Sequence, residues 1–223
     1  MSAYRGPVPE ILIETVLSGM DIDCRSSAGE KISRFLALLV RWNRRVNLIS
    51  STRPDVLTPL IREAVWAAGR YPSDFRVHLD IGSGAGFPAI PLAAIRPDVK
   101  MTMVESREKK AAFLQTAVHD LQLANVRVAN ERLGETLRRS PAPSPWDCVS
   151  WKAVKLSSRD FKRLLEIASA DVRLWMFHGN DLPVENPALV AESLELVRRD
   201  ACPFHPGWFL SDFRRQAVSR ETG

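Results

Sequence analysis

The sequence predicts an α/β fold, with a mostly parallel sheet that carries helices on both faces and a helical N-terminal extension. Three observations support this prediction. From residue 76 onward, short apolar runs alternate with longer stretches of helical spacing, which is typical of βαβ units. A glycine cluster at 82–86 follows the first run and opens a helix-like stretch. Before Tyr71, the apolar residues recur at helical spacings and no strand-like run is found.

The helices of the extension can be placed from the spacing of their apolar residues and from the positions of proline and glycine. We predict a helical extension over residues 1–70 and a second domain over 71–223. A short helix is expected over 9–17, and a longer one over 27–44, where apolar residues recur every three or four positions. A third helix is expected to begin at Pro54, because proline suits the first turn of a helix.

The second domain contains short apolar runs that we predict to be strands, separated by stretches of helical character. The predicted strands are residues 76–81, 99–105, 126–129, 146–151 and 172–178. Beyond residue 187 the alternation weakens. There, 194–199 and 208–213 are expected to form two closing strands in an antiparallel arrangement.

The composition argues against several classes of protein. The 223 residues contain no apolar run near the ~20 residues of a membrane-spanning helix, and the N-terminus lacks the apolar part of a signal peptide. Cys24, Cys148 and Cys202 lie far apart, so we expect no disulfide framework and no metal site, and a reducing cytoplasm is predicted. The net charge of +5, with 24 arginines among the 31 basic residues, is compatible with binding of phosphate or nucleic acid.

The most informative local pattern is Asp-Ile-Gly-Ser-Gly-Ala-Gly-Phe-Pro at 80–88. Glycines permit a tight turn and let a ligand approach the backbone closely. The pattern lies between a predicted strand and a predicted helix, which is the context of a ligand-binding loop. Its candidate cofactor-binding residues are Asp80, Gly82, Gly84, Gly86 and Phe87.

We consider four interpretations of this loop, of which three stay open. A dinucleotide site fits the GxGxxA pattern from Gly84 to Ala89, but it puts Asp80 near the pyrophosphate, which is electrostatically unfavourable. A Walker loop is excluded because no Gly-Lys-Ser/Thr follows the glycines. S-adenosylmethionine carries an ammonium and a sulfonium and no phosphate, so a nearby aspartate is favourable. The fourth interpretation is a structural glycine turn.

The end of the second predicted strand narrows these alternatives. This strand ends in Val104, Glu105 and Ser106, and Glu105 lies 25 residues after Asp80. An acidic residue there can accept both hydroxyls of a ribose. Dinucleotide sites use the same device, so Glu105 indicates a nucleoside without naming it. Together with Asp80, it favours an S-adenosylmethionine site over a dehydrogenase site.

A family resemblance rests on longer motifs. Residues 80–92 follow the pattern D-x-G-S-G-x-G-F-P-x-I-P-L, and 109–114 follow K-K-x-x-F-L. Upstream, 42–48 contain Trp-Asn and Asn-Leu with a spacing of three residues between them, and downstream 146–150 are Trp-Asp-Cys-Val-Ser. Over about residues 30–180, the chain resembles the bacterial 16S ribosomal RNA guanine-N7 methyltransferases, the glucose-inhibited division protein B family. The resemblance implies a class I, Rossmann-like methyltransferase domain.

The resemblance also implies a cofactor, a partner and site residues. The cofactor is S-adenosylmethionine, the partner is 16S rRNA or the small ribosomal subunit, and the product is a guanine methylated at N7. We further expect a monomer. Gly82 and Phe87 match cofactor contacts and Glu105 the ribose-binding acid, while Leu133 and Gly134 match the pair whose backbone receives the adenine. The full cofactor-binding set is Asp80, Gly82, Gly84, Gly86, Phe87, Glu105, Ser106, Leu133, Gly134 and Lys152.

The chain departs from the family pattern at three places that would face the substrate. Lys152 stands where the family has arginine. Lysine keeps the positive charge but lacks the planar guanidinium group, which can donate two parallel hydrogen bonds. His178 stands where the family has lysine. Residues 61–66 replace the family's Arg-His-x-x-Asp-Ser segment. Lys152 and His178 are the candidates for a catalytic role, and Trp151 is a candidate stacking surface for a base.

These departures leave the substrate open. The first hypothesis is methylation of guanine N7 in 16S rRNA, which needs no general base because this nitrogen has a free lone pair, so that catalysis rests on alignment. The alternatives are a methyltransferase of the same fold that acts on a small molecule or peptide, and a catalytically weakened RNA-binding paralogue.

Overall fold

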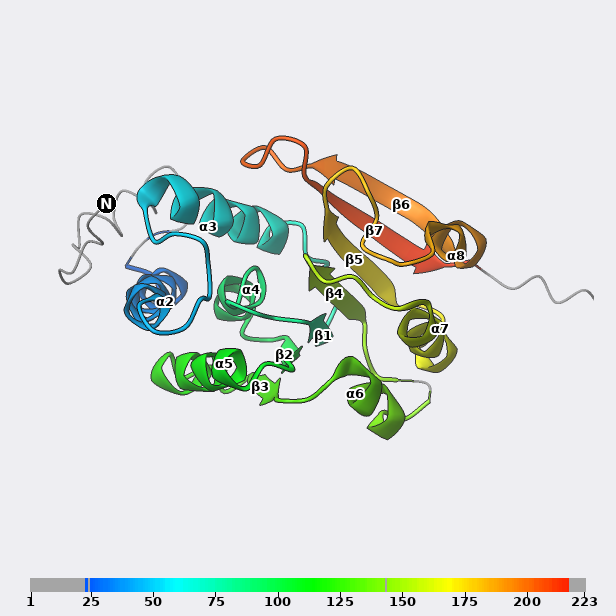
Figure 1. Cartoon of the computed structure of the whole chain (residues 1–223), viewed down its shortest axis with the longest axis horizontal. Coiled ribbons are helices and arrows are strands. Elements are labelled where there is room, and N and C mark those ends of the chain that lie inside the picture. Colours follow the sequence, from blue (N-terminus) through cyan, green and yellow to red (C-terminus); the bar gives the residue numbers. More distant parts are fainter. Residues whose placement is uncertain (1–22, 24, 143, 217–223) are drawn as a thin grey trace, which may run out of the picture.

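The alternation of strands and helices builds one seven-stranded sheet with the order β3-β2-β1-β4-β5-β7-β6 (Figure 1). The computed structural model describes residues 23, 25–142 and 144–216. The helix expected over 9–17 lies outside these residues. The strands are β1 Val77–Ile81, β2 Lys100–Val104, β3 Val126–Ala129, β4 Cys148–Lys152, β5 Arg173–His178, β6 Leu194–Ala201 and β7 Phe209–Arg215.

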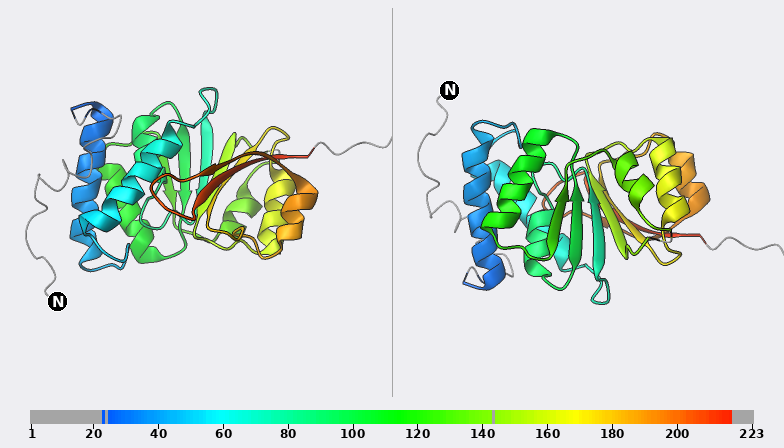
Figure 2. Two further views of the ribbon diagram at one scale, coloured as in Figure 1. Left: turned by 90° about the horizontal axis from the view of Figure 1, so that it is seen from above. Right: turned by 90° about the horizontal axis from the view of Figure 1, so that it is seen from below.

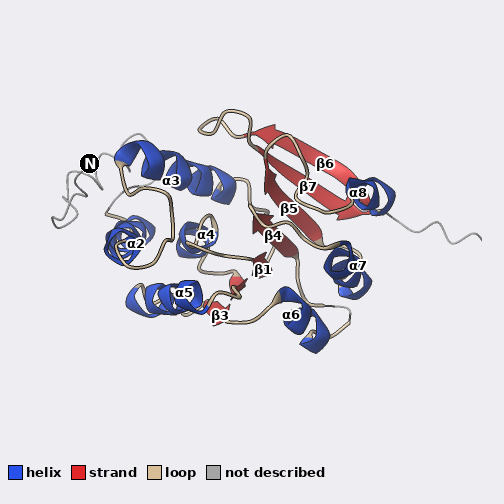
Figure 3. Cartoon of the chain, viewed as in Figure 1, coloured by secondary structure: helices blue, strands red, loops and turns tan. Residues whose placement is uncertain are grey.

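The helices connect these strands and cover the sheet on both sides. They are α2 Ser27–Asn43, α3 Pro54–Ala68, α4 Ala89–Ile95, α5 Glu108–Asp120, α6 Leu133–Arg139, α7 Ser158–Ile167 and α8 Pro187–Ser193. Figures 2 and 3 show the sheet between two helical layers, with α2 to α5 on one side and α6 to α8 on the other. No described helix has the length and apolar character needed to cross a membrane.

Strand direction agrees with the prediction. β1 to β5 run parallel, and β6 and β7 pair antiparallel with each other and with β5. The predicted α/β class and the antiparallel closing strands are therefore confirmed. The predicted strand at 146–151 was placed two residues too early, because Trp146 and Asp147 belong to the loop before β4.

Alternate residues of the strands supply two separate cores. Met101 and Met103 of β2 pack with helices α2 to α5, whereas Leu79 of β1 and Val149 of β4 pack with α6 to α8. A parallel sheet covered on both faces requires this arrangement, since successive side chains point to opposite sides.

The helix α2 begins at a capped turn and packs into the first core. The hydroxyl of Ser26 accepts the backbone N–H of Gly29 at 3.1 Å, which satisfies one of the free donors at the helix start. On the buried face, the ring of Phe35 lies 5.2 Å from the ring of Phe87 and 6.2 Å from that of Phe113. The extension thus shares a core with the helices that follow β1 and β2.

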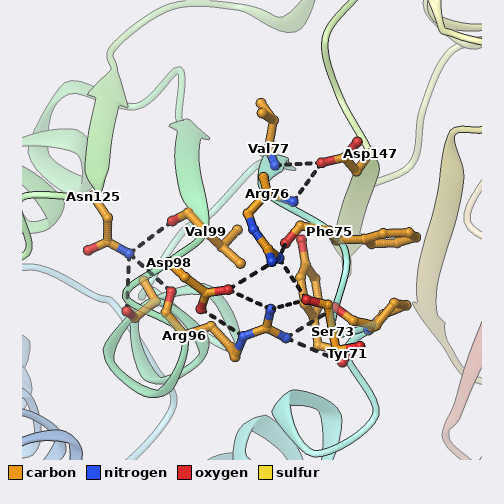
Figure 4. Close-up of polar contacts among 12 residues, drawn as sticks. Tyr71, Ser73, Phe75, Arg76, Val77, Arg96, Asp98, Val99, Asn125 and Asp147 are labelled. Atoms are coloured by element: carbon orange, nitrogen blue, oxygen red, sulfur yellow. Dashed lines mark hydrogen bonds and ion pairs between the residues drawn. The ribbon is translucent and has the colours of Figure 1, made fainter.

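Polar contacts join the amino ends of the strands (Figure 4). Asp147 accepts the backbone N–H groups of Arg76 and Val77 at 2.6 and 2.8 Å. Asp98 pairs with the guanidinium groups of Arg76 and Arg96, at 3.3 and 2.8 Å. These contacts neutralise the charges at the amino ends of β1, β2 and β4 and connect these ends to one another.

We predict that Phe35→Ala lowers the free energy of unfolding by about 3–5 kcal/mol, because it removes a fully buried ring that packs on Phe87 and on Phe113 of α5. Urea unfolding followed by circular dichroism measures the change. Leu196→Ala is the matched control, because Leu196 is 48% exposed and its truncation should change stability by no more than about 0.5 kcal/mol. Equal effects of the two substitutions would contradict the prediction.

Candidate functional site

The sheet topology creates a crevice between β1 and β4. β1 pairs with β2 on one side and with β4 on the other, so the chain reverses its direction of growth at β1. In open α/β sheets, ligands bind outside the carboxyl ends of the strands at such a switch point. The loops that follow β1, β2 and β4 meet there.

The glycine loop after β1 adopts a backbone that other residues rarely tolerate. Gly82, Gly84 and Gly86 have φ angles of +68°, +56° and +85°. A side chain at Gly86 would come within 2.7 Å of Ile90, so this glycine is needed for packing. A Cβ at Gly84 would meet only the carbonyl of Gly82, at 3.6 Å. The outer side of Gly84 therefore borders open space where a ligand can approach.

That space is a cavity of about 510 Å³ at the carboxyl ends of β1, β2 and β4. Its lining includes predicted cofactor residues from three loops: Gly82, Gly84, Phe87, Glu105, Ser106 and Lys152. The structure thus brings together residues that lie up to 70 positions apart in the chain. Gly86 contributes to packing beneath the loop and does not line the cavity.

Glu105 is held against the glycine loop by the backbone. One carboxylate oxygen accepts the N–H of Gly84 at 2.9 Å, and the other accepts the N–H of Arg107 at 2.8 Å. The Asn130 amide donates to the Glu105 carbonyl at 2.9 Å. A carboxylate has about four acceptor sites, so two remain for the hydroxyls of a ribose.

Asp80 lies beneath the loop, buried, and does not line the cavity. The Ser150 hydroxyl donates to its carboxylate at 2.6 Å, and the His78 Nε2 lies 2.7 Å from the same hydroxyl. Burial raises the pKa of Asp80 to about 6 and lowers the pKa of His78 to about 3. His78 is therefore neutral at pH 7, and Asp80 carries a negative charge at the base of the loop.

A second hollow of about 350 Å³ adjoins the first across Val154, which packs on Gly82. Leu133 and Ser106 line it. Gly134 does not line it and instead faces the groove between α6 and α7.

Lys152 reaches the cavity from the end of β4. Its ammonium pairs with the buried Glu63 of α3 and lies 5.6 Å from the centre of the Trp208 ring. The second oxygen of Glu63 lies 3.7 Å from the His205 Nδ1. The buried carboxylate and the ring hold the lysine head at the cavity.

No pattern in the sequence indicated Glu63 as a site residue. Residues 61–66, which include Glu63, were notable only as a departure from the family pattern. This departure, in a chain that also has Lys152 in place of the family's arginine, was the one available signal. Because the two residues lie 89 positions apart, their pairing could be seen only in the folded chain.

Two other candidates lie away from the cavity. His178 donates from Nδ1 to the Gly179 carbonyl at 2.7 Å, and its Nε2 lies 2.8 Å from the Ser211 hydroxyl. It lines a separate hollow bordered by α8, β6 and β7, so the structure does not place it beside Lys152 at the cavity. Trp151 was wrongly considered as a stacking surface: it is fully buried against Phe161, because its side chain points into the second core.

Comparison with known proteins agrees with this geometry. A family model described as rRNA small subunit methyltransferase G matches residues 28–182. The chain belongs to this family. A curated relative from Methylobacillus flagellatus, named ribosomal RNA small subunit methyltransferase G, is 31% identical and covers 80% of this chain and 84% of its own length. A relative of the same name from Xanthomonas axonopodis pv. citri is 37% identical over 68% of each chain.

Solved structures share the fold. A S-adenosylmethionine-dependent methyltransferase from Aquifex aeolicus superposes with a TM-score of 0.55 at 16% identity, covering 70% of this chain and 90% of that one. The mitomycin 7-O-methyltransferase MmcR superposes with a TM-score of 0.52 at 17% identity, covering 92% of this chain and 75% of that one. The class I, Rossmann-like methyltransferase fold is thereby confirmed.

The residues present fit S-adenosylmethionine. The open side of Gly84 admits a ligand next to the backbone, and Glu105 has free acceptor positions for a ribose. Leu133 offers an apolar contact in the adjoining hollow. Among the described residues, no cluster of three or more His, Cys, Asp or Glu side chains is arranged to hold a metal ion.

The buried chain of His78, Ser150 and Asp80 predicts opposing pH effects on stability. Folding lowers the pKa of His78 from 6.5 to about 3, so its contribution to the free energy of unfolding falls as the pH drops below 6.5. Folding raises the pKa of Asp80 from 3.8 to about 6, so its contribution rises as the pH drops from about 6 to about 4. The two effects partly cancel in that range.

Two substitutions separate these contributions. His78→Phe retains the stacking on Tyr71. We expect the free energy of unfolding of this variant to rise, relative to that of the native chain, as the pH falls from about 6 to about 4, because the variant lacks the buried imidazole. Asp80→Asn should show the opposite trend over the same range. Urea unfolding at several pH values measures both, and identical pH dependence of all three proteins would exclude this account.

The glycine cradle predicts the effect of a side chain at Gly84. We expect Gly84→Val to abolish binding of S-adenosylhomocysteine, used as the probe in calorimetry, because the side chain would occupy the open side of the loop. Gly69→Ala is the control, since a Cβ there meets nothing closer than 3.7 Å. If Gly84→Val folds and binds the probe as tightly as the native chain, the cofactor site lies elsewhere.

Proposed function

We propose that this chain transfers a methyl group from S-adenosylmethionine to N7 of a guanine in 16S rRNA. The observation that carries the proposal is the single cavity formed by the glycine loop, Glu105 and Lys152 in a chain of the rRNA small subunit methyltransferase G family. The named relatives are methyltransferases of ribosomal RNA. We also propose that the protein acts as a monomer in the cytoplasm.

The lining of the cavity suits a reaction that depends on alignment. When bound, S-adenosylmethionine supplies an activated methyl group, and its transfer leaves a neutral thioether. The described residues that line the cavity include no histidine and no aspartate. Guanine N7 has a free lone pair, so its attack on the methyl carbon requires no proton to be removed. Glu105 would orient the donor through its ribose, and the loop would align it.

Lys152 suits an electrostatic role toward the base. Transfer to N7 places a positive charge on the guanine, and an unpaired ammonium beside it would oppose that change. In this structure Glu63 balances the charge of Lys152. The ammonium can then donate a hydrogen bond to the guanine carbonyl next to N7 without adding net charge to the site.

The decisive experiment measures transfer of a labelled methyl group to deproteinised 16S rRNA and to purified small subunits, followed by mapping of the modified base. Incorporation at one guanine N7 is expected. Absence of incorporation into either RNA substrate, with intact binding of S-adenosylhomocysteine, would overturn the RNA proposal. That result would favour a small-molecule or peptide substrate, or a paralogue that has lost turnover.

The Lys152–Glu63 pair predicts a specific kinetic pattern. We expect Glu63→Gln to lower kcat by roughly 10-fold, because it leaves the ammonium uncompensated beside the developing positive charge. Affinity for S-adenosylhomocysteine should stay unchanged, since Glu63 does not line the cavity. In the double variant Glu63→Gln/Lys152→Gln, the increase in activation free energy calculated from kcat should be smaller than the sum of the increases in the two single variants. Strict additivity would contradict the coupling.

A further inference from the structure

A groove of about 890 Å³ separates α6 from α7. Figures 1 and 3 show these two helices next to each other on the side of the sheet opposite α2. The exposed cations that line it are Arg132, Arg138, Arg159, Lys162 and Arg163. We call this set the α6–α7 basic groove.

Among the residues that the structure describes, most of these cations have no carboxylate partner. Of the five, only Arg163 forms an ion pair within this part of the chain, with Glu166 at 3.0 Å. Two of the three carboxylates in the groove are engaged: Glu166 by this pair, and Glu135 by the backbone N–H of Arg132 at 3.0 Å. Asp160 is the third and lies half-buried near Gly134. The groove therefore presents an excess of positive charge to solvent.

Nine of the 18 described arginines outside the groove pair with a carboxylate. At the amino ends of the strands, Arg76 and Arg96 share Asp98 (Figure 4). On the antiparallel hairpin, Arg214 pairs with Glu195 at 2.9 Å and Arg198 with Asp200 at 2.9 Å. Charges that the fold leaves unbalanced on one face are available to an external anion.

The groove is continuous with the candidate site. Arg132 and Asp160 line both the groove and the smaller hollow beside the glycine loop. That hollow also contains exposed Lys155, and it shares Gly82, Ser106 and Val154 with the main cavity. A polyanion lying in the groove would therefore reach the hollow beside the glycine loop, next to the cavity that Glu105 and Lys152 line.

We propose that the α6–α7 basic groove binds the phosphodiester backbone of the substrate RNA on one side of the target nucleotide. This rests on the proposed function. Guanidinium groups bind phosphate oxygens through paired hydrogen bonds, and the spacing of several cations along two helices suits successive phosphates. Such contacts position the RNA without selecting its sequence, so the groove would set the register of the strand and leave the choice of base to the cavity.

The test is a charge-neutralising double variant, Arg138→Gln/Lys162→Gln. Its affinity for 16S rRNA at about 0.15 M salt should fall by about 10-fold or more. The slope of log affinity against log salt should decrease in magnitude by about 1.5, as two lost phosphate contacts require. Because both residues lie away from the cavity, kcat at saturating RNA and affinity for S-adenosylhomocysteine should remain unchanged.

The matched control is Lys100→Gln/Arg127→Gln. These two cations are also exposed and form no ion pair among the described residues, but they lie on β2 and β3, outside the groove. The control should leave RNA affinity and its salt slope near those of the native chain. Equal loss in both double variants, or no loss in the groove variant, would overturn the groove as the RNA surface.

Binding and turnover are measured separately, so the two proposals can fail separately. A native chain that methylates RNA, with an unaffected groove variant, overturns only the groove. A native chain that binds RNA through the groove without methylating it overturns the proposed reaction and supports the groove. A native chain that does not bind RNA overturns both.

Discussion

The position of the site depends on the pairing of β1 with β4 at the centre of the sheet. The chain adds β2 and β3 on one side of β1, then crosses to place β4 on the other. In this register Asp80 lies opposite Ser150, and the hydroxyl of Ser150 links the buried Asp80 carboxylate to His78. The glycine loop after β1 and the lysine that ends β4 consequently border the same cavity. A shift of this register by one residue would turn both ends away from it.

Charged side chains have different kinds of partner at the amino ends of the strands, at their carboxyl ends and on the helices that cover the sheet. At the amino ends, carboxylates and carbonyls satisfy the arginines, which fixes the strands relative to one another. At the carboxyl ends, Glu105 is held by backbone N–H groups and Lys152 by the buried Glu63, so each charged group is oriented before a ligand arrives. The α6–α7 basic groove retains unbalanced cations. Charged groups that are already oriented, such as Glu105 and Lys152, can stabilise a reaction in the cavity. Exposed cations without a partner can attract a large anion.

Those parts of the site that depend on short chain segments could be predicted. The positive φ angles of Gly82 and Gly84 follow from a tight turn between a strand and a helix. Glu105 directly follows the neighbouring strand β2, 21 residues from its partner Gly84. The prediction of Trp151 as a stacking surface is wrong, because neighbouring residues of a strand point to opposite faces. Lys152 reaches the cavity, whereas Trp151 is buried in the second core. His178 ends a strand of the same sheet, yet Ser211 of β7 binds it on the other side.

The sequence by itself determined the α/β class, the glycine loop, the acidic residue that follows β2 and the family. These features rest on local periodicity, on backbone conformations that only glycine adopts readily, and on motifs that are contiguous in the chain. Only the tertiary structure decided that Glu63 of α3 pairs with Lys152, that Asp80 supports the loop from below, and that the cations of α6 and α7 face a common groove. These arrangements join residues from different elements. They follow from how the helices pack on the sheet, which no local pattern records.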